Sequence, residues 1–94
     1  MRNTTITIKN ETGLHARPAS QFAKKASNYQ SEIKILKDNE EVNGKSVMGV
    51  MSLGVDKKDE ITLEINGEDE DKAMEKLTKL INEELPEVDN DAKG

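Results

Sequence analysis

The sequence predicts an α+β fold, an open-faced sandwich in which three helices cover one face of a four-stranded antiparallel sheet. Some segments alternate apolar and polar residues with the period of a strand, and others repeat apolar residues with helical spacing. Each predicted strand has one apolar face, so all helices must cover the same side of the sheet. The 94 residues contain no internal repeat. We therefore expect one domain over residues 1–85, followed by a polar tail at 86–94.

The predicted strands come from short alternating segments. Residues 4–9, 32–37 and 60–65 alternate in this way, as expected for strands with one buried face. A shorter piece around 41–43 follows the turn-like sequence KDNE, and we expect it to form a hairpin with 32–37. The residues expected to point inward are Ile6, Ile8, Ile33, Ile35, Ile61, Leu63 and Ile65.

Three segments between the strands have helical spacing. Residues 16–27 and 69–84 each carry an apolar stripe, formed by Ala19, Phe22, Ala23 and Ala26 and by Ala73, Met74, Leu77, Leu80 and Ile81. The acidic sequence EDED suits the start of the third helix, and Pro86 is expected to end it. In SVMGVMSLG, a short helix ending at Gly54 would place Val47, Val50 and Met51 on its inward face.

The composition excludes several classes of protein. The chain has 14 basic and 19 acidic residues, a net charge of −5, and Phe22 and Tyr29 as its aromatic residues. A nucleic-acid-binding protein would normally show a basic stripe and stacking aromatics. No apolar run is long enough to span a membrane, and the N-terminus does not resemble a secretory signal. We expect a cytoplasmic monomer that binds no nucleic acid and does not insert into a membrane.

A metal or nucleotide site is poorly supported by the residue types present. The chain has no cysteine and one histidine, so it has neither a disulfide framework nor the ligands of a typical zinc site. It also lacks a glycine-rich phosphate loop. We therefore expect no metal and no cofactor.

The single histidine lies in the sequence GLHARPA. Gly13 permits a tight approach to a helix and Pro18 suits a first turn, so the helix should begin near Ala16 with His15 just before it. The free backbone N–H groups of Ala16 and Arg17, with the Arg17 guanidinium, would then form an anion site beside a nucleophilic imidazole. This pattern favours a phosphoryl acceptor. The alternative is a solvated or helix-capping histidine.

Ser46 precedes the short helix at the N-cap position. Its hydroxyl would stabilise the helix by about 1 kcal/mol whatever else it does. A phosphate at a helix N-terminus is electrostatically favourable, so modification of Ser46 need not unfold the domain. Met48 falls outside the predicted inward face, and an exposed methionine there indicates a partner surface, although isolated exposed apolar residues are also ordinary.

GLHARPA, followed about thirty residues later by GKSVMGVMSLG, resembles the HPr family of histidine-containing phosphocarriers over residues 2–85. This family belongs to the bacterial phosphoenolpyruvate-dependent sugar phosphotransferase system. The resemblance implies a carrier, not an enzyme: His15 would accept a phosphoryl group on Nδ1 from phosphorylated Enzyme I and pass it to Enzyme IIA domains of sugar permeases. Arg17 matches the family's arginine beside the phosphohistidine.

The resemblance also implies regulation of the Gram-positive type. Ser46 matches the serine that HPr kinase/phosphorylase modifies, after which the protein acts with a catabolite-control transcription factor in carbon catabolite repression. The docking surface for these partners would include Val47, Met48, Met51, Gln21 and Lys24. A purely regulatory protein with an idle His15 is the alternative, which the GLHARP sequence disfavours. The chain departs from the family pattern in its acidity and in its tail at 86–94.

Overall fold

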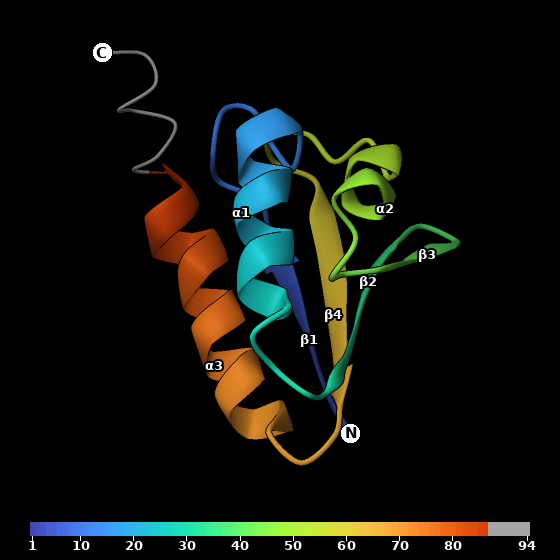
Figure 1. The fold of residues 1–94 in the computed structure, drawn as a ribbon. Helices are drawn as coiled ribbons and strands as arrows, with labels where there is room; N and C mark the ends of the chain where they lie inside the picture. Colours follow the sequence, from blue (N-terminus) through green and yellow to red (C-terminus); the bar gives the residue numbers. More distant parts are fainter. Residues whose placement is uncertain (87–94) are drawn as a thin grey trace.

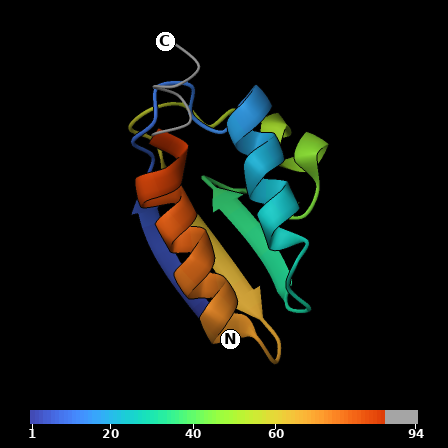
Figure 2. The same cartoon turned by 60° about the vertical axis from the view of Figure 1, so that its left-hand side comes forward.

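The computed structural model describes residues 1–86, and within them the chain forms an open-faced sandwich (Figure 1). The elements follow one another as β1 (Arg2–Thr7), α1 (Ala16–Ala26), β2 (Glu32–Lys37), β3 (Glu40–Asn43), α2 (Val47–Ser52), β4 (Glu60–Asn66), α3 (Glu70–Lys79) and the π-helical segment η1 (Leu80–Glu84). The strands form one antiparallel sheet in the order β1-β4-β2-β3. The helices lie on a single face of it (Figures 1 and 2). The predicted fold class is therefore confirmed.

The core fills the space between the sheet and the helices. Ile33 and Ile35 of β2 lie opposite Ile65 and Leu63 of β4, so their side chains form one continuous apolar layer. Phe22 of α1 is fully buried against this layer. Every residue predicted to point inward from a strand is buried, and so is every residue of the apolar stripes predicted for the two longer helices. None of the helices within residues 1–86 has the length and apolar character to cross a membrane.

The first strand is shifted from its predicted position. It spans Arg2–Thr7, where the alternation predicts 4–9. Thr7 pairs with Glu60, the first residue of β4, so the partner strand offers no further backbone to extend the pairing. Ile8 is nonetheless buried, because its backbone binds the turn before β4: its N–H donates to the Asp59 carbonyl at 2.8 Å and its carbonyl accepts from Lys58 at 2.8 Å.

The short helix α2 buries one of the three residues predicted to face inward. Val50 is fully buried, whereas Val47 and Met51 are 39% and 40% exposed, so the prediction for these two was wrong. The reason is the position of α2, which packs beside α1 and β3 at the edge of the sandwich (Figure 1). Because α2 has 6 residues and lies at this edge, Val50 is the residue of the helix that is buried in the core. Met48 is 81% exposed, as predicted.

The end of α3 also differs from its prediction. The pattern predicts one continuous helix over 69–84, but the α-helix ends at Lys79 and a π-helical turn follows over Leu80–Glu84. In this turn the Leu85 N–H donates to the Leu80 carbonyl, and Leu80, Ile81 and Leu85 are all buried. Pro86 continues the helical conformation, so it does not end the helix as expected. The rest of the predicted tail lies outside the described residues, and its separation from the domain stays a prediction.

The start of α3 is tied to the loop between α1 and β2 by a carboxylate. Asp69 accepts hydrogen bonds from the Ser31 hydroxyl, the Gln30 N–H at 2.9 Å and the Ser31 N–H at 3.0 Å. Ser31 itself is buried. These hydrogen bonds, led by that of the Ser31 hydroxyl, hold the pKa of Asp69 below its usual range. The bonds therefore stabilise the ionised carboxylate in the folded state.

Asp69→Asn should make the free energy of unfolding less dependent on pH in the acidic range. Because the folded-state pKa of Asp69 is lowered, its carboxylate stabilises the fold at neutral pH, and this contribution is lost as pH falls through the lowered pKa. Urea unfolding should show the variant to be less stable than the wild type at neutral pH, with the difference shrinking below about pH 4. Asp71→Asn, which removes an exposed carboxylate 3.4 Å from Arg2, serves as the control. An equal loss of stability at all pH values would contradict this account.

The connection between β1 and α1 lies directly on the backbone that leads into β4. Gly13 has φ +60°, and a Cβ atom built there would lie 2.1 Å from the Val55 carbonyl oxygen and 2.8 Å from the Asp56 Cα. The Leu14 N–H donates to the same Val55 carbonyl at 3.0 Å. The buried Asn10 side chain donates to the Gly13 carbonyl at 2.6 Å. Glycine is thus required here for both its conformation and its size.

Gly13→Ala should destabilise the fold more than Gly54→Ala. Both glycines have positive φ, 60° and 63°, but Gly54 has no atom within 4 Å of a built Cβ. A backbone strain of about 1–2 kcal/mol is therefore expected in each of the two alanine variants. At Gly13 the Val55 carbonyl must also move, which should raise the loss to roughly 3 kcal/mol or more. Urea unfolding of both variants measures the difference, and equal losses would show that the contact with Val55 is unimportant.

Candidate functional site

His15 lies at the N-cap of α1 and presents its ring to solvent. Its backbone is extended, with φ −107° and ψ 158°, and α1 begins at Ala16 as predicted. Ala16 has φ +46°, so the chain turns sharply as it enters the helix. The His15 side chain is 41% exposed and makes no capping hydrogen bond to the helix. The alternative interpretation as a helix-capping histidine is therefore wrong.

The His15 ring is oriented by one contact from a distant part of the chain. Its Nε2 atom lies 2.9 Å from Oδ1 of Asp56, which stands between α2 and β4. No hydrogen bond to Nδ1 is found within residues 1–86. One ring nitrogen is thus occupied and the other is available for chemistry. Sequence reasoning missed Asp56, because nothing in the local pattern of GVDKKDE links it to a residue 41 positions earlier.

Groups suited to an anion surround the start of α1. Ala16 and Arg17 belong to the first helical turn, where backbone N–H groups lack an acceptor within the helix. Pro18, the next residue, has no N–H and is buried. The exposed Arg17 forms no ion pair with any described residue. Its guanidinium therefore remains available to an incoming phosphate or carboxylate.

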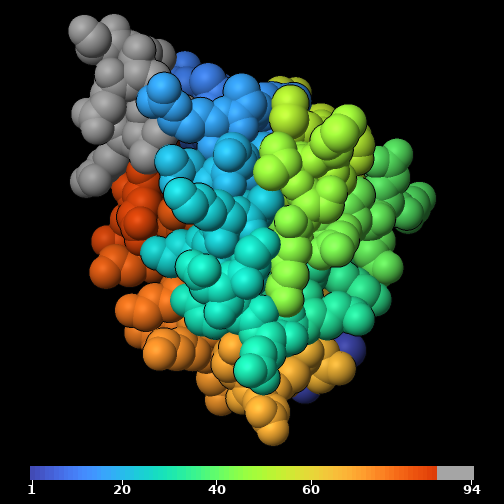
Figure 3. All heavy atoms as spheres, viewed as in Figure 1, coloured from blue at the N-terminus to red at the C-terminus, as the bar shows by residue number. Residues whose placement is uncertain are grey.

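The face formed by α1 and α2 is basic, although the whole chain is acidic. Residues 12–31 and 42–55 contain no aspartate or glutamate, and they carry Arg17, Lys24, Lys25 and Lys45. The two helices lie side by side on this face (Figure 3). Gln21 and Lys24 are exposed and follow Arg17 at helical spacing, so these three residues share one side of α1.

The short helix α2 adds a polar cap and an apolar patch to this face. The Ser46 Oγ accepts a hydrogen bond from the Gly49 N–H at 3.0 Å, which confirms the predicted N-cap. Val47, Met48 and Met51 are all exposed. Exposed large apolar side chains gathered on one short helix are typical of a surface that meets partner proteins.

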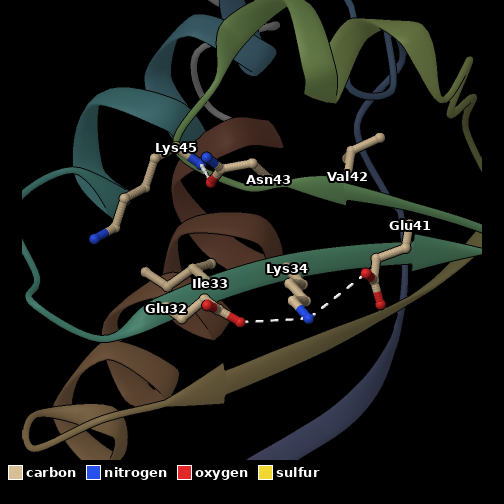
Figure 4. A pocket seen from close by; sticks show the side chains of 7 residues that line it. All are labelled: Glu32, Ile33, Lys34, Glu41, Val42, Asn43 and Lys45. Carbon is tan, nitrogen blue, oxygen red and sulfur yellow. Dashed lines mark hydrogen bonds and ion pairs between the residues drawn. The ribbon is translucent and has the colours of Figure 1, made fainter.

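A depression between β2 and β3 borders this face at Lys45 (Figure 4). Lys34 crosses it, 3.3 Å from Glu32 and 3.5 Å from Glu41. The hydrogen bond with Glu32 and the charge of Glu41 raise the pKa of Lys34. The charges of Lys34, Glu32 and Glu41 thus offset one another in this depression. None of the predicted site residues lines it. Within the described part of the chain, no cluster of histidine, cysteine, aspartate or glutamate could hold a metal ion.

Known proteins resemble the chain over most of its length. The family model described as "PTS HPr component phosphorylation site" matches residues 2–83. The HPr-like protein Crh of Bacillus subtilis is 44% identical over 80 residues, which cover 85% of this chain and 94% of Crh. The phosphocarrier protein HPr of Neisseria meningitidis serogroup A is 46% identical over 82 residues, 87% of this chain and 92% of that protein.

The structure of HPr-C-His from Thermoanaerobacter tengcongensis is also similar. It has a TM-score of 0.88 and 48% identity over 90% of this chain and 96% of that one. A second structure, described as an HPr dimer from the same organism, has a TM-score of 0.72. The fold, the exposed histidine at the start of α1 and these similarities agree. The chain belongs to the HPr family of phosphocarrier proteins of the phosphotransferase system, and it is a carrier, not an enzyme.

Proposed function

We propose that His15 accepts a phosphoryl group on Nδ1 from phosphorylated Enzyme I and donates it to Enzyme IIA domains of sugar permeases. The observation that carries this proposal is the state of the His15 ring, which is exposed at the start of α1 and is held at Nε2 while Nδ1 is open. The neutral imidazole supplies the nucleophile. The N–H groups of Ala16 and Arg17 and the Arg17 guanidinium receive the transferred charge.

The basic face supports docking to acidic partner surfaces. Arg17 and Lys24 would attract such a partner, while Gln21 and the exposed Val47, Met48 and Met51 supply polar and apolar contacts around them. We propose that Enzyme I, the Enzyme IIA domains and a catabolite-control transcription factor share this face. The cytoplasm, where these partners act, is the proposed location.

Regulation at Ser46 is the second part of the proposal. Ser46 caps α2 and stands beside the exposed apolar residues, so a phosphate added there by HPr kinase/phosphorylase would change the charge of the docking face. It would oppose an acidic partner without touching the imidazole. The similarity to Crh of Bacillus subtilis, whose solution structure is described as that of the catabolite repression HPr, favours a purely regulatory role as the second candidate. The presence of His15 with an open Nδ1 favours the carrier.

We propose a monomer as the working state. The exposed apolar residues of α2 form a small patch, whereas a stable dimer interface normally buries about 800 Å² on each partner. A dimer is known for the relative from Thermoanaerobacter tengcongensis. Light scattering over a range of protein concentrations distinguishes the two states.

His15→Ala should abolish phosphoryl acceptance. The wild type, incubated with Enzyme I and phosphoenolpyruvate, should gain the mass of one phosphoryl group, and acid should remove it because the N–P bond of phosphohistidine hydrolyses in acid. Intact mass spectrometry before and after acid treatment measures both. If the wild type gains no mass, and ATP with the kinase gives an acid-stable adduct at Ser46, the protein is a regulator and the carrier proposal is wrong.

Ser46→Asp should slow phosphoryl transfer from Enzyme I, whereas Ser46→Asn should not. Asparagine and aspartate cap a helix about as well as serine, so both variants keep α2 and differ in one negative charge. The charge should raise the KM for Enzyme I several-fold, by roughly 3- to 10-fold, and the effect should weaken at high salt. Steady-state transfer kinetics at two salt concentrations provide the measurement. A KM for Ser46→Asp equal to that of Ser46→Asn would argue against regulation through docking.

A further inference from the structure

Asp56 is the acidic residue that contacts the proposed phosphoryl acceptor. Its Oδ1 lies 2.9 Å from His15 Nε2, and its own side chain is 73% exposed. No side-chain carboxylate occurs in residues 12–31, which surround His15 in the sequence, or in residues 42–55, which precede Asp56. A negative charge beside a group that must receive a phosphoryl anion would by itself oppose the reaction. The position of Asp56 beside His15 therefore indicates a specific role in the chemistry of the imidazole ring.

The backbone fixes Asp56 beside His15. Gly13 lies against Val55 and Asp56, so the two connecting segments touch without an intervening side chain. The Asp56 N–H donates to Oδ2 of Asp59 at 2.8 Å, and the Asp59 N–H returns a hydrogen bond to the Asp56 carbonyl at 3.0 Å. Lys37 holds the Asp59 carboxylate at 3.2 Å. These hydrogen bonds and the ion pair thus fix the conformation of the turn that carries the Asp56 carboxylate.

The chemistry of the contact selects one form of the imidazole. An ionised carboxylate accepts hydrogen bonds and cannot donate them, so the proton of the neutral ring must reside on Nε2. The lone pair then resides on Nδ1. We propose that Asp56 is a positioning residue that holds His15 in the Nε2–H tautomer and orients Nδ1 for phosphoryl transfer. This inference rests on the proposed function.

Asp56 also stabilises the charge that forms during transfer. The Nδ1 lone pair forms the new N–P bond while the bond between phosphorus and the donor breaks, and its electron pair leaves with the donor. The ring keeps its Nε2 proton and becomes positively charged, facing the Asp56 carboxylate. The same charged ring is the better leaving group when the phosphoryl group passes to the next acceptor. Asp56 thus favours acceptance through its charge, and by keeping Nε2 protonated it lets the ring leave as a neutral imidazole when the phosphoryl group passes on.

The tautomer of His15 provides a direct test. Nitrogen-15 NMR of the ring at alkaline pH, where the imidazole is neutral, should show almost entirely the Nε2–H form in the wild type. Asp56→Asn can turn its amide so that it donates to Nε2, which favours the Nδ1–H form, as happens when an orienting aspartate is replaced elsewhere. Asp56→Ala removes the contact, and Asp56→Glu should restore part of it. Glu60→Gln, which removes one exposed carboxylate four residues further along the chain, at the start of β4, serves as the matched control.

Transfer kinetics complete the test. The turnover number for phosphoryl acceptance from Enzyme I should fall by about 3- to 10-fold in Asp56→Asn and Asp56→Ala, since the pair is partly exposed, while the KM stays unchanged. An unchanged tautomer, or transfer that is equally fast or faster in both variants, would overturn the inference. Failure of the wild type to accept a phosphoryl group would instead overturn the proposed function and, with it, the role of Asp56 in transfer.

Discussion

The close backbone contact between Gly13 and residues 55–56 is the constraint on which the site depends. No side chain separates the two segments, and the hydrogen bond from Leu14 to Val55 joins them. The backbone of Ile8 binds the turn at Lys58 and Asp59 on the same side. Because both connecting segments are held in this way, two residues outside the regular helices and strands face each other at a defined distance. The backbone thus sets the place from which the Asp56 side chain orients the His15 ring.

The distribution of charge separates the functional face from the rest of the surface. Within residues 1–86, most acidic residues lie on α3, on the sheet and in the turns. Several of them meet basic partners, as Glu32 and Glu41 meet Lys34. The α1 and α2 segments contribute basic residues and no acidic ones to their shared face. The acidic residues that contact it come from elsewhere in the chain: Glu84, 3.7 Å from Lys25, and Asp56, beside His15. A partner approaching within a Debye length of about 8–10 Å responds to this local potential more than to the net charge of −5. An acidic chain can therefore present a basic docking surface.

The buried faces of the strands and the helix N-cap at Ser46 could be predicted because they depend on residues close together in the sequence. The alternation of Ile61, Leu63 and Ile65 marks the buried face of a strand, and the N-cap at Ser46 depends on residues three positions apart. The spacing of Val47, Val50 and Met51 showed that they share a side of α2. It did not show how little of that side meets the core, because this depends on where a short helix sits at the edge of the sandwich.

Other features depend on contacts between distant segments. The π-helical turn over Leu80–Glu84 accompanies the burial of Leu85, which no periodicity within the segment reports. The contact of Asp56 with His15 joins residues 41 positions apart. It arises from the packing of Gly13 on Val55, although the sequence marked only Gly13 as a tight approach. The position of His15 at the start of α1, next to Ala16 and Arg17, could therefore be predicted, but the residue that orients the ring could not.

A carrier must bind its phosphoryl group firmly enough to keep it and weakly enough to release it. In a closed, water-excluded pocket, fixed charges act at a low effective dielectric constant and would hold the dianionic group strongly. Here the exposed ring stands at a helix start, so water screens Arg17 and the backbone N–H groups. In the proposed role of Asp56, its carboxylate keeps the ring proton on Nε2 and directs Nδ1 outward. In the proposed transfer, the docking partner supplies the enclosure that speeds the reaction, so that one exposed histidine would serve both donor and acceptor.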